Sequence, residues 1–233
     1  MRASLQYSGP MLSPTAGPAV GPHRVLVTGF DPFGGQSINP SWTAVQALDG
    51  TELDGHGLIA AQLPTRFDRA LPTLLELIAR HRPALVVCTG QAGGRAAISL
   101  ERVAINVVDA RIPDNAGAQP VDVPVAPGGP AAYFTTLPIK AMLATMLGQG
   151  IRADVSQTAG TFVCNHVFYG LMHRLATEPA LAHTRGGLLH VPWLPQQGHP
   201  SMTLEQLATG LEVALRCAVH TFDDLRIQAG ALN

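Results

Sequence analysis

The sequence predicts an α/β fold in which helices cover both faces of a mostly parallel sheet. Short apolar runs such as 24–29 (RVLVTG) and 84–89 (ALVVCT) lack the polar alternation of a strand that has one face in water. Segments with helical periodicity lie between these runs, which is typical of a parallel sheet. Hydrophobic residues make up 46% of the chain and charged residues only 13%, which indicates a large buried core or buried subunit interfaces.

The predicted strands and helices alternate along most of the chain. The expected elements are, in order, a strand at 24–29, a helix at 40–48, a strand at 57–63, a helix at 68–81, a strand at 84–89, strands within 100–108, a helix at 130–147, a strand at 153–156, a helix at 164–175, a strand at 187–191 and a helix at 203–220.

Local signals mark where several of the helices begin. Asn39 followed by Pro40 combines an N-cap residue with proline at the first helical position. Asp68 can cap the next helix. Thr203 and Gln206 have the spacing of a capping box, so the last helix has the clearest predicted start.

The middle of the chain is less regular. The run 100–108 follows a glycine loop and is mostly apolar, which favours strands. The segment 121–133 (VDVPVAPGGPAAY) is too rich in proline and glycine for a helix, and helical periodicity returns over 130–147.

Residues 24–233 are expected to form a single domain. Residues 1–23 are rich in proline and glycine and lack the apolar stretch of a signal peptide, so we interpret them as a flexible N-terminal extension.

Composition and charge exclude several classes of partner. The formal net charge is −1, so no basic field is present to bind nucleic acid. No apolar run reaches the about 18 residues that a membrane span needs. Three widely spaced cysteines indicate neither a disulfide framework nor a zinc site, and the sequence therefore predicts a cytoplasmic protein.

Loops that follow strands are where a parallel sheet places its functional residues. Cys164 opens a predicted helix after such a loop, where unpaired backbone N–H groups and the helix dipole favour a thiolate and could bind an oxyanion. The alternative is that Cys164 is a small buried hydrophobic residue, which is the better interpretation for Cys88 and Cys217.

A cysteine nucleophile needs a base and a group that orients the base. Among the nine histidines, His190 ends a predicted strand, whereas His166 shares the helix of Cys164 and points away from it. Glu101 lies in an apolar passage where an unpaired charge would be costly, and a protonated imidazole is a better candidate partner than the adjacent Arg102. Without further context, His190 could equally be a core or loop histidine.

Two other sites are weakly indicated. The loop at 90–95 (GQAGGR) follows a strand but lacks the glycine spacing and the lysine of phosphate-binding loops. A metal site formed by Cys164, His166 and His173 lacks a nearby carboxylate and the usual histidine spacing.

Five motifs in the same order make the chain resemble the pyroglutamyl peptidase I family, intracellular cysteine exopeptidases also called pyrrolidone-carboxylate peptidases. The motifs, spread over about 24–220, are VLVTGFDPFGG, GQAGGR, ERVAINVVDARIPDN, TAGTFVCNHVFYGLMH and HVPWLP. The resemblance implies a three-layer α/β/α sandwich around a twisted sheet, and a homodimer or homotetramer. It also implies removal of an N-terminal pyroglutamyl residue from peptides through a thioester, without metal or cofactor.

The resemblance also implies the residues of the site. The catalytic triad falls on Glu101, Cys164 and His190. The substrate pocket falls on Phe30, Phe33, Gln91, Phe162 and Val163. The N-terminal extension and a slightly long stretch at 178–187 depart from the family pattern, but neither removes a catalytic residue.

The pocket residues suit a flat, uncharged lactam. Aromatic faces can sandwich the ring, and a carboxamide such as that of Gln91 can exchange hydrogen bonds with it. Three alternatives remain open at this point: the phenylalanines are core residues, the enzyme cleaves another small cyclic amide, or the protein binds a lactam without cleaving it.

Overall fold

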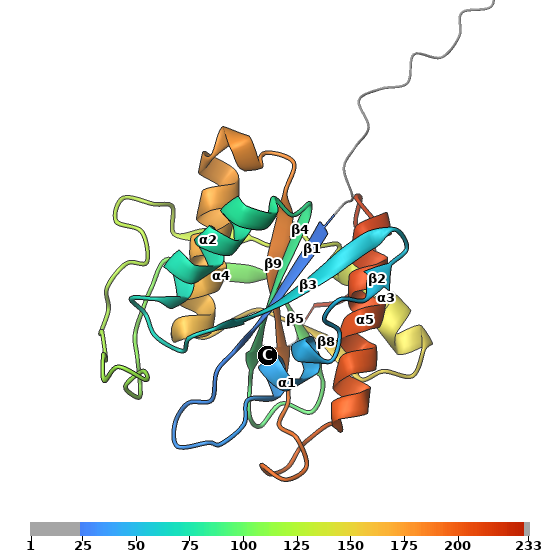
Figure 1. Ribbon diagram of the computed structural model, residues 1–233, viewed down its shortest axis with the longest axis horizontal. Helices are drawn as coiled ribbons and strands as arrows, with labels where there is room; N and C mark the ends of the chain where they lie inside the picture. Colours follow the sequence, from blue (N-terminus) through green and yellow to red (C-terminus); the bar gives the residue numbers. More distant parts are fainter. Residues whose placement is uncertain (1–23, 231–233) are drawn as a thin grey trace, which may run out of the picture.

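The computed structural model describes residues 24–230, and its centre is a seven-stranded sheet between two layers of helices (Figure 1). The strands of the sheet, in spatial order, are β2 (Glu52–Leu53), β3 (His56–Leu63), β1 (Arg24–Phe30), β4 (Leu85–Gln91), β9 (Arg185–Val191), β5 (Ile98–Glu101) and β8 (Ala153–Ser156). The helices are α1 (Pro40–Gln46), α2 (Ala70–His81), α3 (Ile139–Gly148), α4 (Val163–Thr177) and α5 (Leu204–His220), with a short 3₁₀ helix at Pro179–Leu181.

The sheet is mostly parallel, as predicted. Strands β3, β1, β4 and β9 run in one direction. The direction reverses once on each side, because β2 is antiparallel to β3, and β5 is antiparallel to β9. The edge strand β8 runs parallel to β5. The α/β prediction is therefore confirmed, with a reversal at β9–β5 that the sequence did not indicate.

Two hydrophobic clusters fill the space between the layers. One joins the sheet to α1, α3 and α5, and the other joins it to α2 and α4 (Figure 1). Along β1, Val25 and Val27 belong to the first cluster, whereas Leu26 and Phe30 belong to the second. Burial on both faces is the physical reason that this strand is apolar throughout.

The predicted helix at 130–147 is wrong in its first part. Ala132–Phe134 forms strand β7, which pairs with β6 (Val103–Ile105), and α3 begins only at Ile139. Pro138 supplies the reason, since it disfavours helical geometry at the residue before it. The predicted strand run at 100–108 is likewise divided between β5 and β6, which belong to different sheets.

The predicted cap of α2 is also wrong. Arg69 occupies the N-cap position without a side-chain cap bond, and Asp68 pairs with Arg66 instead. The capping box of α5 is confirmed, because Thr203 accepts the N–H of Gln206 and the Gln206 side chain accepts the N–H of Thr203.

Two further expectations concern the ends of the chain and the membrane. The predicted extension at 1–23 lies outside the described residues. Within residues 24–230, no helix is long and apolar enough to cross a bilayer.

The α5 capping box gives a stability prediction. Thr203→Ala should lower the free energy of unfolding by about 1 kcal/mol, because a backbone N–H in the first turn loses its acceptor. Urea unfolding followed by circular dichroism measures the change. Thr209→Ala, at an exposed position within the same helix, is the matched control and should not lower the free energy of unfolding. Equal losses in the two variants would contradict the capping role.

Candidate active site

Three separate elements bring Glu101, Cys164 and His190 together on one face of the sheet. Glu101 ends β5, Cys164 lies in the first turn of α4, and His190 is the penultimate residue of β9. Because β5 is antiparallel to β9, Ser99 lies opposite His190, and Glu101, two residues further along β5, lies diagonally across from His190. A side chain as long as glutamate can span that diagonal, and Glu101 Oε1 lies 2.7 Å from His190 Nδ1.

This hydrogen bond determines which nitrogen of the His190 imidazole carries the proton. An ionised carboxylate only accepts hydrogen bonds, so His190 Nδ1 must carry the proton. The other ring nitrogen, Nε2, is then the atom that is free to accept a proton in the neutral ring.

Gly90 shows that Nε2 is close to the sulfur of Cys164. Gly90 on β4 is the register neighbour of His190 on β9. A Cβ atom at this glycine would lie 2.6 Å from Cys164 Sγ and 3.0 Å from His190 Nε2. The sulfur and the nitrogen therefore both lie over the Cα of Gly90, and only a residue without a side chain leaves room for them.

The Glu101 carboxylate is fully buried, with two donors on one oxygen. Arg95 Nη1 donates to Oε1 at 2.6 Å, in addition to His190. Burial on its own would raise the pKa of Glu101, but the His190 hydrogen bond and the charges of His190 and Arg95 outweigh it and lower the pKa. The imidazole is thus a partner of Glu101, as expected, while Arg102 reaches Ala229 instead.

Arg95 is a site residue that sequence reasoning missed. Its second Nη atom donates to the carbonyl of Thr158 at 3.0 Å, which ties the loop before β5 to the loop before α4. The available signal was the last residue of GQAGGR, a cation six positions before a carboxylate in an apolar passage.

The surroundings of Cys164 disfavour the expected thiolate. Burial, together with the negative charge of Glu101, raises the pKa of the thiol to about 12. Arg95 and the backbone N–H of Cys164 act in the opposite direction but are weaker. A neutral thiol is therefore favoured at Cys164, and His190 Nε2 is a proton acceptor that lies over the same glycine.

The other two cysteines behave as the sequence predicted. Cys88 has no exposed surface within β4, and burial raises the pKa of its thiol to about 12. Cys217 is half-buried on α5, where its sulfur lies 3.5 Å from the hydroxyl of Thr145.

The start of α4 is held by side-chain hydrogen bonds. Asn165 is buried, and its amide bonds the backbone of Ile105 and Val107 through three hydrogen bonds of 2.9–3.0 Å. The Thr161 hydroxyl donates to the carbonyl of Asp109 at 2.7 Å. Because the first turn of a helix has N–H groups without intrahelical acceptors, this fixed start presents donors beside the sulfur of Cys164.

Aromatic side chains gather next to the start of α4. The ring of Phe162 lies 5.9 Å from Phe33 and 5.3 Å from Phe67 between centroids. Phe67 also contacts His166, edge to face at 5.7 Å. Phe67 is a second residue that sequence reasoning missed, since only its proximity to Phe162 distinguishes it from other loop aromatics.

Asp114 holds Phe67 in this cluster. One of its carboxylate oxygens accepts the N–H of Phe67 at 2.9 Å, and the other accepts the N–H groups of Ala116 and Ala118. Burial would raise the pKa of Asp114, but these backbone hydrogen bonds lower it. The RIPDN motif thus organises a loop that borders the aromatic cluster.

The remaining predicted pocket residues occupy different environments. Phe30 and Val163 are almost completely buried, at 1% and 0% exposure, within the cluster beneath α4. Gln91 ends β4, and its side-chain oxygen accepts a hydrogen bond from Gln197 at 3.2 Å. Its NH₂ group donates no hydrogen bond within residues 24–230.

The alternative metal site is not assembled. Within residues 24–230, no cluster of three or more histidine, cysteine or acidic side chains is placed to hold a metal ion. His173 Nδ1 bonds the hydroxyl of Tyr133 at 2.9 Å, and burial lowers the pKa of His166.

Comparisons with known proteins all point to one family. The family model described as pyroglutamyl peptidase matches residues 23–221. The pyrrolidone-carboxylate peptidase of Cupriavidus taiwanensis is 57% identical over 90% of this chain and 99% of its own, and that of Klebsiella pneumoniae is 53% identical over the same shares.

Solved structures are similar as well. Pyroglutamyl peptidase I from Bacillus amyloliquefaciens superposes with a TM-score of 0.86 and 47% identity, covering 88% of this chain and 99% of that one. The pyrrolidone carboxyl peptidase from Thermococcus litoralis has a TM-score of 0.85 and 34% identity, with the same coverage.

The buried carboxylate predicts a pH-dependent stability. Glu101→Gln should lower the free energy of unfolding by about 2 kcal/mol near pH 7, because Arg95 loses its buried counter-ion. The pKa of Glu101 in the folded protein lies below its unfolded value of about 4.3. The carboxylate's contribution is therefore fully present above that value and is lost as the pH falls through the folded pKa.

Urea unfolding at pH 7 and at about pH 3.5 measures this effect. The difference in free energy of unfolding between the parent and Glu101→Gln should be smaller at the lower pH. The exposed substitution Glu76→Gln is the control and should show a small, nearly constant difference. If the difference in free energy of unfolding between the parent and Glu101→Gln stays constant or increases on acidification, the buried Glu101 carboxylate is not ionised in the folded protein.

Proposed function

The chain belongs to the pyroglutamyl peptidase family, and we propose that Cys164, His190 and Glu101 are the residues with which it removes the N-terminal pyroglutamyl (5-oxoprolyl) residue from peptides. One observation carries this assignment. The sulfur of Cys164 and Nε2 of His190 lie over Gly90, while Nδ1 of the same ring is bonded to Glu101. That order of thiol, imidazole and carboxylate is the arrangement of a catalytic triad.

The first half of the reaction forms a thioester. His190 Nε2 takes the proton of the Cys164 thiol while the sulfur attacks the carbonyl carbon between pyroglutamate and the next residue. Backbone N–H groups in the first turn of α4 stabilise the resulting oxyanion. His190 then gives its proton to the amine of the shortened peptide, and the C–N bond breaks.

The second half releases pyroglutamate. His190, now neutral, removes a proton from water as the water attacks the thioester. The tetrahedral intermediate expels the Cys164 thiolate, which recovers the proton from His190. The pair thus returns to the neutral state favoured by the raised pKa of the buried thiol.

Glu101 and Arg95 support both halves. The carboxylate keeps the proton on Nδ1 and stabilises the imidazolium that forms twice in each cycle. Arg95 holds the same carboxylate oxygen, so it acts by positioning Glu101 rather than by touching the substrate.

The pocket suits a neutral lactam ring. Phe33 and Phe162 offer aromatic faces beside Cys164, and Phe67 supports Phe162. The Gln91 oxygen is taken by Gln197, which leaves its NH₂ group to donate to the lactam carbonyl. A charged glutamate side chain would lose its hydration there without gaining a counter-ion. Phe30 and Val163 are assigned to the floor of the pocket, on account of their burial next to this cluster.

We also propose that the chain acts in the cytoplasm as a homodimer or homotetramer. All three cysteines are unpaired, which fits a reducing compartment. Large hydrophobic side chains are exposed at Val121, Phe134 and Leu147, where a second copy could cover them.

Replacing the nucleophile tests the mechanism. Cys164→Ser should reduce hydrolysis of a chromogenic pyroglutamyl amide at least about a thousandfold, because a hydroxyl is a much weaker nucleophile than a thiol. Circular dichroism should show an unchanged fold. Cys217→Ser is the matched control and should retain the parent rate. Substantial turnover by Cys164→Ser would contradict the proposed thioester.

Gly90 offers an independent test of the geometry. Gly90→Ala should lower kcat/KM about a hundredfold, because its Cβ would overlap the sulfur of Cys164 and push it away from His190. Gly57→Ala, at a strand position with open space around the new Cβ, is the control and should leave turnover unchanged.

Thermal unfolding separates this effect from a general loss of fold. The destabilisation caused by Gly90→Ala should be smaller in a Cys164→Ala background, where the sulfur is absent. If Gly90→Ala is as active as the parent, the two reactive atoms do not lie over this glycine.

A further inference from the structure

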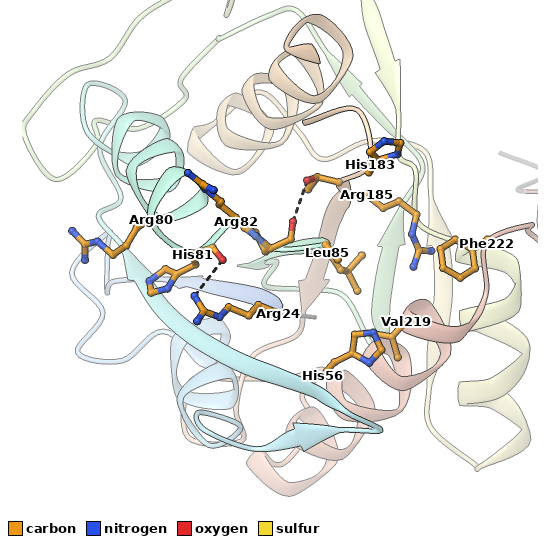
Figure 2. A pocket seen from close by; sticks show the side chains of 13 residues that line it. Arg24, His56, Arg80, His81, Arg82, Leu85, His183, Arg185, Val219 and Phe222 are labelled. Carbon is orange, nitrogen blue, oxygen red and sulfur yellow. Dashed lines mark hydrogen bonds between the residues drawn. The ribbon is translucent and has the colours of Figure 1, made fainter. Parts of the chain in front are cut away.

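A second pocket lies at the end of the sheet opposite to Cys164. It is a cavity of about 900 Å³, and its floor is built from the first residues of β1, β4 and β9, including Arg24, Leu85 and Arg185. Figure 2 shows Arg24 and Leu85 in the middle of the pocket, with Arg82 and His183 on one side and His56 on the other. His190 is five positions after Arg185 along β9, a span of about 17 Å. The pocket is therefore separate from the active site.

The lining is strongly basic. Four arginines and three histidines contribute to it: Arg24, Arg80, Arg82, Arg185, His56, His81 and His183. Among the described residues that line the pocket, none is acidic. Asp54 follows β2 next to His56, but its carboxylate is engaged by Arg216 and His220. The net charge of the whole chain is only −1, so this local excess of basic side chains is unusual.

Interactions with helix C-termini balance only part of the positive charge of the pocket. Arg24 donates to the carbonyl of His81 at the end of α2, and Arg185 donates to the carbonyls of Ala218 and Thr221 at the end of α5. Each helix C-terminus carries about half a negative charge, so the two ends together offset about one of the four arginine charges. Within residues 24–230 no acidic side chain forms an ion pair with these arginines, so an excess of about three positive charges remains.

The floor of the pocket is fixed by the fold. The carbonyl of Arg24 accepts the N–H of Ala84, and the carbonyl of Ala84 accepts the N–H of Arg185. The hydroxyl of Thr184 donates to the carbonyl of Pro83 at 3.0 Å, which Figure 2 shows as a dashed line. The arginines are thus attached to a rigid frame, and a ligand would not have to order the backbone on binding.

We propose that this pocket binds a small polyanion that carries two or more phosphate groups. Arginine forks bind phosphate oxygens in pairs, and Arg80 and Arg82 are exposed at the rim, where they form no ion pair with an acidic side chain of the described residues. A ligand of two to four negative charges would balance the excess. Phe222, which stacks against Arg185 at 4.4 Å and is 75% exposed, adds an apolar wall for the rest of such a molecule.

A small ligand fits better than nucleic acid. The positive charge is confined to one concave pocket of a size typical of small-molecule sites. A nucleic-acid surface would instead need basic residues along an extended face, and the net charge of the chain opposes this.

Isothermal titration calorimetry of the full chain with inorganic tripolyphosphate tests the proposal. We expect saturable binding with one tripolyphosphate per chain, and weaker binding of orthophosphate. Arg82→Gln should weaken tripolyphosphate binding about tenfold, since one charge-assisted contact is lost. Arg226→Gln removes an exposed arginine outside the pocket and should change the affinity less than twofold. Hydrolysis of the pyroglutamyl amide by both variants, at the parent rate, would show that they are folded.

Three results would overturn the proposal. The first is the absence of saturable binding at millimolar tripolyphosphate. The second is equal weakening by Arg82→Gln and Arg226→Gln, which would mean diffuse electrostatic attraction only. The third is tighter binding of a short DNA duplex than of tripolyphosphate, which would assign the charge to a nucleic-acid surface.

Discussion

The buried carboxylate of Glu101 is the interaction on which the site depends. A carboxylate without solvent contact stays ionised only if donors replace its water, and here His190 and Arg95 both donate to one oxygen. The bond to His190 sets the tautomer of the ring and directs Nε2 towards Cys164. Arg95 also bonds Thr158, so it connects the same carboxylate to the loop that precedes α4. One buried charge therefore aligns His190, the proposed base, and couples it to the segment of Cys164, the proposed nucleophile.

The reversal between β9 and β5 makes this burial possible. In a wholly parallel sheet, the last residue of a strand lies at the edge where loops and water meet. Here β5 enters the sheet at that edge and runs inwards, so Glu101 at its end lies behind His190 and is shielded from water. The loop GQAGGR then has to cross the edge between β4 and β5, which places Arg95 within reach of the carboxylate.

The parallel part of the sheet explains why the two ends of the molecule differ in chemistry. At the carboxyl ends of the strands, α4 begins and presents free N–H groups beside Cys164. At the amino ends, α2 and α5 finish, and their carbonyls attract Arg24 and Arg185. Helix dipoles of common direction thus favour an oxyanion at one end and cations at the other. The small net charge of the chain gives no indication of this difference between the two ends of the sheet.

The sequence by itself determined the features that depend on neighbouring residues. Apolar runs indicated strands buried on both faces, Thr203 and Gln206 marked a helix start, and the family motifs singled out the residues that the fold brings together. Only the tertiary structure decided the reversal of β5, the pairing of Arg95, the strand at 132–134 and the raised pKa of Cys164. These features depend on strand register and on burial by distant segments. Because both are set by which parts of the chain become neighbours in space, no local pattern records them.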